Sequence, residues 1–224
     1  MRIRVIQLGY FITFEGVEGC GKTTQIKLIS EFLLAHGVHT VLTREPGGCP
    51  IADKIRSILL DADNKALSPL AELMLYAAAR AQHITEIISP ALTAGKVVLC
   101  DRFSDATVAY QSFGRGIDRS IIDTLNLHAC QGVKPNITVL VDCDPRLGLE
   151  RAIRRIEAST GPREERFELE VLDFHQRVRA GYLQLAADDP ARFMVIDGSK
   201  TIEEIFSVLS RQLLSRIPED LRAV

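Results

Sequence analysis

The residues of this chain with the clearest chemical purpose run from Gly16 to Thr23. They match the pattern G-x-x-x-x-G-K-[ST], in which successive backbone N–H groups face one concavity and bind phosphate oxygens. Glycines permit this because they adopt backbone conformations that are closed to most other residues. In such a loop, Lys22 reaches the β- and γ-phosphates of a nucleotide, and the Thr23 hydroxyl ligates Mg²⁺. The segment therefore predicts that the protein binds a nucleoside triphosphate.

The flanking residues predict the strand and the helix that would position this loop. The apolar run at 10–15 is typical of a β-strand, and the run at 25–34 has the spacing of an amphipathic helix that stops at Gly37. The positive end of the helix dipole would add to the attraction for phosphate. An ordinary glycine turn can match the bare pattern, but the order strand, loop and helix favours a P-loop. The predicted ATP contacts are Gly16, Val17, Glu18, Gly19, Cys20, Gly21, Lys22, Thr23 and Thr24.

The rest of the chain alternates between strand-like and helical runs, which is typical of parallel βαβ units. A long helix is expected from Pro69 to Gly95, and a last helix is expected from Thr201, where Glu204 completes a capping box. The remaining strands are expected at 38–43, 96–100, 137–142 and 192–196. We therefore predict an α/β P-loop NTPase fold, with a five-stranded parallel sheet flanked by helices in a single domain over 1–224.

Composition argues against several other classes of protein. A length of 224 residues, 46% of them hydrophobic, suits one α/β domain with a sizeable core. The net charge is −2 without a basic block, so nucleic acid is not expected as a partner. The five cysteines lack metal-ligand spacing and are expected as free thiols of a reducing compartment. Because the sequence has no signal-peptide pattern or membrane-length apolar run, we expect a cytoplasmic protein without a membrane partner.

Two charged residues follow directly on the strand predicted at 96–100. In a P-loop fold, the carboxylate of Asp101 at that strand end would hold Mg²⁺ or its water. Arg102 does not lose its charge and suits a phosphate clamp. An Asp–Arg surface pair is the alternative, but the presence of the P-loop favours the functional interpretation. The predicted metal ligands are Thr23 and Asp101.

Three further features could bind a ligand but also have ordinary structural explanations. The Pro-Gly-Gly turn at 46–48 follows the second strand, at the sheet edge where ligands of open α/β folds collect. Arg56, on a helix that starts near Pro50, is better explained as a solvated arginine when the residues are considered alone. Tyr76 and Arg80 are four residues apart and share one helix face, although tyrosine at helical spacing usually belongs to the core.

A charged stretch at 159–166 interrupts two helical runs with turn residues. It fits a solvated helix–turn–helix, and it equally fits a short mobile lid whose arginines close over phosphates. Charge alone does not distinguish these two interpretations.

Four motifs stand in order along the chain: Phe14–Thr24, Arg44–Gly48, Asp101–Phe103 with Ala109–Gln111, and Glu165–Glu168. Together they resemble the motifs of the bacterial thymidylate kinase family, and the resemblance extends over about residues 10 to 210 without large gaps. It implies ATP-dependent phosphorylation of dTMP to dTDP by in-line phosphoryl transfer with Mg²⁺. It also implies that the enzyme forms a homodimer.

The resemblance implies a dTMP site formed by Glu18, Glu45, Arg56, Tyr76, Arg80, Arg102, Thr107, Tyr110 and Gln111. In this site Glu18 would meet the 3′-hydroxyl of the sugar. Tyr110 would pack against C2′, where a ribose hydroxyl would collide. Arg56 and Arg102 would clamp the acceptor phosphate.

The same resemblance assigns the base contacts. Tyr76 would stack on thymine, Arg80 and Thr107 would hydrogen-bond its edge, and Gln111 would border the pocket. Through the resemblance, Tyr76, Arg80 and Tyr110 argue against the nearest alternative, a kinase for another nucleoside monophosphate or a deoxynucleoside. A GTPase switch is disfavoured because the chain has Asn-Lys-Ala-Leu at 64–67 and no Asn-Lys-x-Asp base reader.

Some relatives carry an arginine inside the P-loop, where this chain has Gly19. The resemblance therefore implies that a lid at about 151–167 supplies the catalytic arginine. The candidates are Arg154, Arg155, Arg163 and Arg166, with Arg151 ranked below them. We favour Arg155 and Arg163, so that the predicted catalytic residues are Lys22, Arg102, Arg155 and Arg163.

Overall fold

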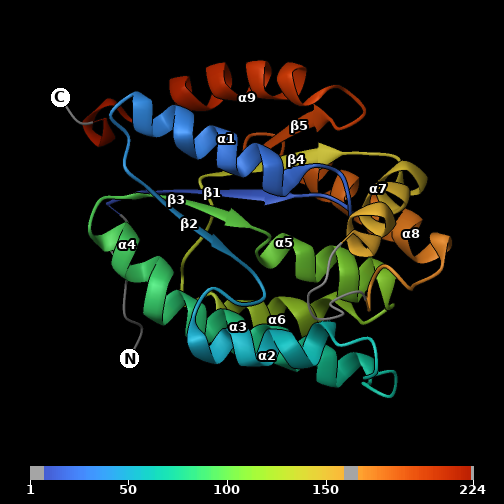
Figure 1. Ribbon diagram of the computed structural model, residues 1–224. Helices are drawn as coiled ribbons and strands as arrows, with labels where there is room; N and C mark the ends of the chain where they lie inside the picture. The colour runs from blue at the N-terminus through green and yellow to red at the C-terminus, as the bar shows by residue number, and fades with distance from the viewer. Residues whose placement is uncertain (1–7, 159–165, 223–224) are drawn as a thin grey trace.

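The computed structural model describes residues 8–158 and 166–222 and contains one five-stranded sheet (Figure 1). Its strands are β1 Tyr10–Glu15, β2 Thr40–Arg44, β3 Val97–Asp101, β4 Ile137–Asp142 and β5 Phe193–Asp197. Their spatial order is β2-β3-β1-β4-β5, and all neighbouring pairs are parallel. The predicted five-stranded parallel sheet is confirmed, and the strand that leads into the P-loop, β1, lies at its centre.

Helices connect the strands and cover both faces of the sheet. Figure 1 shows α1 and α9 together on one side of the sheet, with α3, α4, α5 and α6 on the other. The long helices are α1 Lys22–Ala35, α2 Pro50–Leu60, α3 Pro69–His83, α6 Arg119–Ala129, α7 Pro145–Glu157, α8 Leu172–Asp188 and α9 Ile202–Arg216. The shorter helical segments are η1 Ile84–Ile88, α4 Ser89–Thr93, α5 Ser104–Thr107, η2 Val108–Gly114 and η3 Glu219–Leu221. Within the described ranges, no helix has both the length and the hydropathy needed to cross a membrane.

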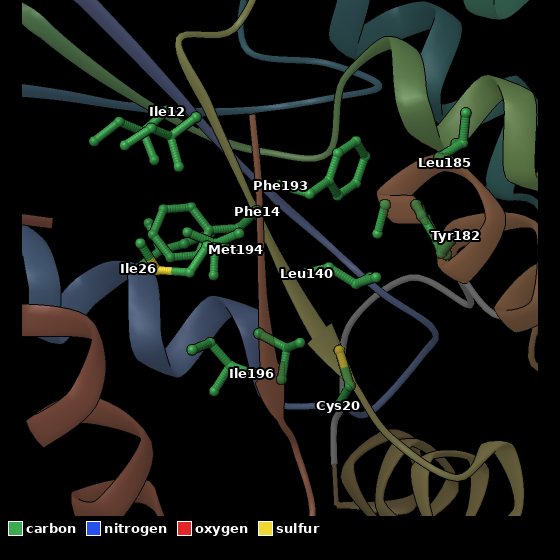
Figure 2. Close-up of a cluster of buried hydrophobic side chains, with 14 of the residues drawn as sticks. Ile12, Phe14, Cys20, Ile26, Leu140, Tyr182, Leu185, Phe193, Met194 and Ile196 are labelled. Carbon is green, nitrogen blue, oxygen red and sulfur yellow. The ribbon is translucent and has the colours of Figure 1, made fainter. Parts of the chain in front are cut away.

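The core lies on both faces of the sheet, as is usual when helices cover a parallel sheet on each side. Phe14 of β1, Met194 of β5 and Ile26 of α1 gather on one face (Figure 2). Phe193, the neighbour of Met194 in β5, lies on the other face with Tyr182 of α8 (Figure 2). Successive strand residues point to opposite faces, so each strand contributes side chains to the core on both faces. Packing on both faces holds the strand ends in fixed positions.

The single long helix predicted from Pro69 to Gly95 is wrong in one respect. The chain there forms α3, the wide turns of η1 and then α4. In η1 the Ser89 N–H donates to the carbonyl oxygen of Ile84, five residues back, instead of four. Pro90 follows immediately, and a proline has no N–H to continue an α-helical hydrogen-bond ladder. The widened turn lies next to the residue that interrupts the ladder.

The capping box predicted at the last helix is confirmed. The Thr201 hydroxyl accepts a hydrogen bond from the Glu204 N–H at 3.2 Å, and the Glu204 carboxylate accepts one from the Thr201 N–H at 2.9 Å. These bonds satisfy two of the N–H groups that the helix start leaves unpaired. They fix the start of α9 beside the P-loop, where it lines a cavity described below.

Two glycines let α7 lie against the P-loop. A Cβ atom on Gly19 would lie 1.9 Å from the carbonyl oxygen of Gly148, and a Cβ atom on Gly148 would lie 2.3 Å from that of Glu18. Both distances are far shorter than van der Waals contact, so the backbones of the loop and of α7 touch directly. The helix that leads to the predicted lid is therefore in contact with the phosphate loop itself.

Replacing Gly148 with alanine tests this contact. Alanine favours a helix over glycine by about 1 kcal/mol, so helix propensity alone would stabilise Gly148→Ala. We expect the opposite, a loss of about 1–3 kcal/mol in the free energy of unfolding, because the added methyl group overpacks the contact. Urea denaturation measures the change. The control is Glu150→Ala, an exposed position on the same helix, which should stay within about 0.5 kcal/mol of wild type. An equal effect of both changes would contradict the contact.

Candidate active site

The P-loop connects the carboxyl end of β1 to the start of α1. Its three glycines have positive φ angles, 138° at Gly16, 65° at Gly19 and 96° at Gly21. Residues with side chains rarely adopt these angles, which explains the glycine at each position. Gly21 is the residue that caps the start of α1, so the loop ends at the positive pole of that helix. The glycine pattern of the sequence and the geometry of the loop both indicate an anion-binding site.

The ammonium group of Lys22 lies inside this loop. Its Nζ atom donates to the carbonyl oxygens of Gly16 at 3.0 Å and Val17 at 2.9 Å, and it lies 3.4 Å from the Cys20 sulfur. The side chain is almost completely buried. The loop therefore carries a fixed positive charge, held by its own carbonyl groups, at the place where phosphates are predicted to bind.

Thr23 and Asp101 meet beside the loop. The Thr23 hydroxyl donates to the Asp101 carboxylate at 2.9 Å, although the two residues are far apart in the sequence. A hydroxyl and a carboxylate are oxygen ligands of the kind that a hard divalent cation takes. Among the described residues, no group of three or more His, Cys, Asp or Glu side chains could hold a metal ion. A cation at Thr23 and Asp101 would therefore take its other ligands from water and phosphate oxygens, which is the usual arrangement for Mg²⁺.

A cavity of about 390 Å³ opens over the P-loop. Beyond the loop it is lined by Gln25, Arg151, Arg155, Gly198, Lys200, Thr201, Ile202 and Ile205. Arg151 of α7 donates to the Gly198 carbonyl oxygen at 3.1 Å, which joins α7 to the turn before α9. Sequence reasoning missed the segment 198–205 as part of a site because it matches no motif. Its volume is within the range of small-molecule sites, and its lining includes Lys22, Arg151, Arg155 and Lys200, whose charges suit an anionic ligand such as a nucleotide.

Arg102 connects the loop to a second group of side chains. Its guanidinium group donates to the Gly16 carbonyl oxygen at 2.9 Å, to the Tyr182 hydroxyl at 3.0 Å and to Glu18 at 3.1 Å. It also lies over the ring of Tyr110, 4.8 Å from the centroid. The backbone of Arg102 is in the left-handed region, with a φ of 70°. A non-glycine residue in this region is uncommon and often marks a functional position.

Glu18 receives hydrogen bonds from three side chains. Its Oε1 atom accepts from Tyr110 at 2.5 Å and from Arg102 at 3.1 Å, and its Oε2 atom lies 3.1 Å from Nδ1 of His175. Burial alone would raise the pKa of Glu18, but the hydrogen bond from His175 and the charge of Arg102 outweigh burial and lower this pKa to about 2. Glu18 is therefore ionised at neutral pH.

Glu15, three residues before Glu18, lies in a different environment. Its carboxyl group accepts from the Phe103 N–H at 2.7 Å and from the Tyr182 hydroxyl at 2.7 Å. Burial, followed by the nearby charge of Asp105, raises the pKa of Glu15 to about 8. The Tyr182 hydroxyl accepts a hydrogen bond from Arg102 and donates one to Glu15. Glu15 therefore helps to hold Arg102 in position through this hydroxyl.

Arg80 is bound mainly by the protein. Its guanidinium group donates to Glu45 at 2.8 Å, to Asn126 at 2.8 Å, to the Phe103 carbonyl oxygen at 3.0 Å and to Thr107 at 2.8 Å. An arginine has five N–H donors, so these bonds leave one N–H, on Nη1, for a ligand. The structure brings Arg80, Glu45 and Thr107 together as the resemblance implied. Glu45 pairs with Arg80 and also lies 3.1 Å from Nδ1 of His83, so it holds Arg80 in place.

Gln111, another of the predicted pocket residues, contacts a buried acid, Glu72, that sequence reasoning missed. Gln111 donates to Glu72 at 2.8 Å, and Glu72 also pairs with Arg115 at 3.2 Å and Arg166 at 2.7 Å. Because a carboxylate only accepts, the Gln111 amide must point its NH₂ group at Glu72. The sequence offers no local signal for this group, since its members come from three segments that are far apart in the sequence.

Aromatic rings cover the same region. Tyr76, Tyr110 and Phe167 are neighbours, with ring centroids 6.5 Å apart for Tyr76 and Phe167 and 5.4 Å apart for Tyr110 and Phe167. Arg56 lies at the Pro-Gly-Gly turn, where it donates to the Pro46 carbonyl oxygen at 3.0 Å. It therefore connects α2 to this turn.

The candidate lid arginines differ sharply in their surroundings. Arg155, near the end of α7, is 63% exposed, lines the cavity over the P-loop and lies 3.6 Å from Glu168. Arg166 is only 9% exposed, pairs with Glu72 and donates to the Leu59 carbonyl oxygen. Arg151 and Arg155 line the cavity over the P-loop, and Arg166 contacts α3 and the end of α2. Arg163 lies in 159–165, outside the described residues.

The chain is similar to known proteins along most of its length. A family model described as thymidylate kinase matches residues 14–208. The thymidylate kinase of Trichlorobacter lovleyi is 63% identical over 207 residues, which cover 92% of this chain and 98% of that protein. The thymidylate kinase of Geotalea uraniireducens is 59% identical over 212 residues, which cover 95% of this chain and 100% of that protein.

A solved structure agrees in fold. The crystal structure of thymidylate kinase from Ehrlichia chaffeensis matches with a TM-score of 0.72 at 35% sequence identity. The match covers 92% of this chain and 98% of that one. The overall fold described above therefore recurs in a protein that shares about one third of its residues with this chain.

The raised pKa of Glu15 predicts a pH dependence of stability. Because this pKa is about 8 in the folded protein against an ordinary value of 4.5, the folded state binds the proton more tightly than the unfolded state. The contribution of Glu15 to the free energy of unfolding is therefore full below about pH 4.5, falls as the pH rises towards 8, and is constant above it. Glu15→Gln removes this dependence, so its stability relative to wild type should rise between pH 5 and pH 9.

Denaturant unfolding of both proteins across this pH range measures the effect. The control is Tyr182→Phe, which deletes a hydrogen bond to Glu15 but keeps the titrating carboxyl group. Its stability difference from wild type should not follow the Glu15→Gln pattern. A constant difference between Glu15→Gln and wild type at all pH values would contradict the assignment.

Proposed function

Because the chain belongs to the thymidylate kinase family, we propose that it transfers the γ-phosphoryl group of ATP to dTMP, giving ADP and dTDP. It is a phosphotransferase. One observation carries the proposal beyond family membership. Arg102 contacts the P-loop at Gly16 and the neighbouring Glu18 at the same time, so one cation joins the predicted donor and acceptor sites.

The donor site is proposed to lie over the P-loop. The nine residues from Gly16 to Thr24 would surround the phosphates of ATP, and the cavity between Arg151 and the start of α9 would receive the base and sugar. Thr23 and Asp101 would hold Mg²⁺, which neutralises phosphate charge when bound. Their oxygen ligands and their position beside the loop support this choice of metal.

The acceptor site is proposed to lie between Arg102 and the aromatic group. Tyr76 would stack on thymine, and the Nη1 hydrogen of Arg80 that the protein leaves unused would reach the base edge with Thr107. Gln111 would border the base, and Tyr110 would pack against the sugar. The acceptor phosphate would contact Arg56 and Arg102, and the sugar 3′-hydroxyl would contact Glu18.

Charge repulsion between two phosphate-bearing substrates is the main obstacle to this reaction. The acceptor phosphate is already anionic near neutral pH, so the reaction needs no strong base, and the protein acts by positioning and neutralising charge. Lys22 and Arg102 supply two fixed cations. Arg155 is proposed as a third from α7, because it is exposed and lines the cavity over the P-loop. Arg163 remains a second lid candidate within the proposed lid at 151–167. A supplied arginine of this kind is typically worth about 10³–10⁵ in rate.

The protein is further proposed to act as a homodimer in the cytoplasm. Large apolar side chains are exposed on α2, α3 and α6, namely Ile51, Ile58, Leu70, Met74, Ile121 and Leu127. These helices pack side by side, α2 on α3 and α3 on α6, so the exposed side chains offer a common surface for a second copy. All five cysteines are free thiols, which suits a reducing compartment.

A coupled ADP-release assay with a panel of nucleoside monophosphates tests the proposed function. We expect dTMP to be the preferred acceptor over dCMP, dAMP and dGMP. Lys22→Ala should keep its fold, because the glycines shape the loop, but should lose turnover by about 10²–10³-fold, because the fixed charge is gone. Circular dichroism checks the fold. Turnover that survives in Lys22→Ala, or a preference for another acceptor, would refute the proposal.

The sugar pocket makes a separate prediction. Tyr110→Ala removes the ring proposed to exclude a 2′-hydroxyl, so kcat/KM for ribothymidine monophosphate relative to dTMP should rise about tenfold. Tyr110→Phe is the matched control, since it keeps the ring and loses only the hydroxyl bonded to Glu18. It should keep the wild-type selectivity against the ribonucleotide. Equal selectivity in all three proteins would show that Tyr110 does not line the sugar pocket.

A further inference from the structure

The three donors around Glu18 are divided unequally between its two carboxylate oxygens. Oε1 accepts from both Tyr110 and Arg102, at 2.5 and 3.1 Å, whereas His175, at 3.1 Å, is the one partner of Oε2 within residues 8–158 and 166–222. Each carboxylate oxygen accepts about two hydrogen bonds. Oε1 is therefore saturated, and one acceptor position is left on Oε2.

His175 has no second polar contact among the described residues. It is completely buried at the start of α8, and its Nε2 atom has no hydrogen-bond partner there. Its ring meets that of Phe174 edge-on, with centroids 5.4 Å apart. Buried polar groups are normally fully hydrogen-bonded, so a purely structural histidine would be expected to join two parts of the fold through both nitrogens. The polar contact of this histidine is made with Glu18.

The contact of His175 matters because the bonds to Oε1 leave the Glu18 carboxylate able to rotate about that oxygen. The terminal torsion of a glutamate is broad and weakly restrained. Tyr110 and Arg102 hold one oxygen, and a donor on the second oxygen fixes the plane of the whole group. Since Oε2 is ionised and accepts only, the hydrogen in this bond is on Nδ1 of His175.

We propose that His175 is a positioning residue that fixes Oε2 of Glu18 to accept a hydrogen bond from the 3′-hydroxyl of the acceptor nucleotide. This inference rests on the proposed function. It assigns a role to His175, which belongs to none of the sequence motifs. It also identifies Oε2 as the Glu18 oxygen that would bind the sugar hydroxyl. In this arrangement His175 never touches the substrate and acts through Glu18.

Two substitutions of His175 separate positioning from packing. His175→Asn keeps a side-chain N–H near the position of Nδ1, whereas His175→Leu fills a similar volume without a donor. Steady-state kinetics with dTMP and with 3′-deoxythymidine monophosphate compare acceptors with and without the hydroxyl that Oε2 would bind. His39→Leu, at an exposed histidine outside the site, is the control for the loss of an imidazole.

We expect the wild-type protein and His39→Leu to prefer dTMP over the 3′-deoxy acceptor. In His175→Leu this preference in kcat/KM should fall about tenfold or more, through a higher KM for dTMP and little change for the 3′-deoxy acceptor. His175→Asn should restore most of the preference. An unchanged preference in His175→Leu would overturn the proposal, as would an equal loss in His175→Asn, which would indicate packing.

A measurement on the wild-type protein covers the case in which the leucine variant does not fold. In ¹⁵N-histidine spectra, dTMP should shift the Nδ1 resonance of His175 and the 3′-deoxy acceptor should leave it near its free position. Equal shifts with both acceptors would overturn the proposal. If the wild-type protein does not phosphorylate dTMP, this inference and the proposed function are both overturned. If the wild-type protein phosphorylates dTMP normally and His175→Leu keeps the wild-type acceptor preference, this inference alone is overturned.

Discussion

The three hydrogen bonds of the Arg102 guanidinium are the interaction on which the rest of the site depends. They join Arg102 to two positions of the P-loop, the Gly16 carbonyl oxygen and the Glu18 carboxylate, and to Tyr182 of α8. The uncommon left-handed backbone of Arg102 directs the guanidinium back across the end of β1. Two polyanions can approach one another only if positive charge is fixed between them, and this network fixes it before any substrate arrives.

The same network explains how two glutamates on one short segment reach opposite states. Glu18 has a cation and two further donors within 3.1 Å, so its negative charge is retained. Glu15 has two uncharged donors and a neighbouring aspartate, so burial dominates and the proton is retained up to about pH 8. A charged pair of acids here would repel a phosphate. Keeping Glu15 protonated lowers the negative charge beside the proposed acceptor site and preserves its hydrogen bond with Tyr182.

Local pattern was enough to predict the sheet, the P-loop and the capping box at Thr201, because each depends on residues close together in the sequence. The widened turns at 84–88 were missed because the helical periodicity of the sequence continues through them. Pro90 is the one residue nearby that is unfavourable inside an α-helix. The contacts of His175 and Glu72 were also missed. They join segments separated by up to 157 residues, and a lone histidine or glutamate in a helix has no distinguishing spacing. The resemblance named Arg80 as a base contact, but it could not show that protein groups take four of its five donors.

The contact between Gly19 and Gly148 has a consequence for how this family changes over time. Relatives with an arginine at the position of Gly19 need a side chain where this protein has the backbone of α7, 1.9 Å from where a Cβ atom would start. One substitution therefore cannot convert this arrangement into theirs, because the intermediate would have a displaced helix and a damaged phosphate loop. A change from one arrangement to the other therefore requires the P-loop and α7 to change together.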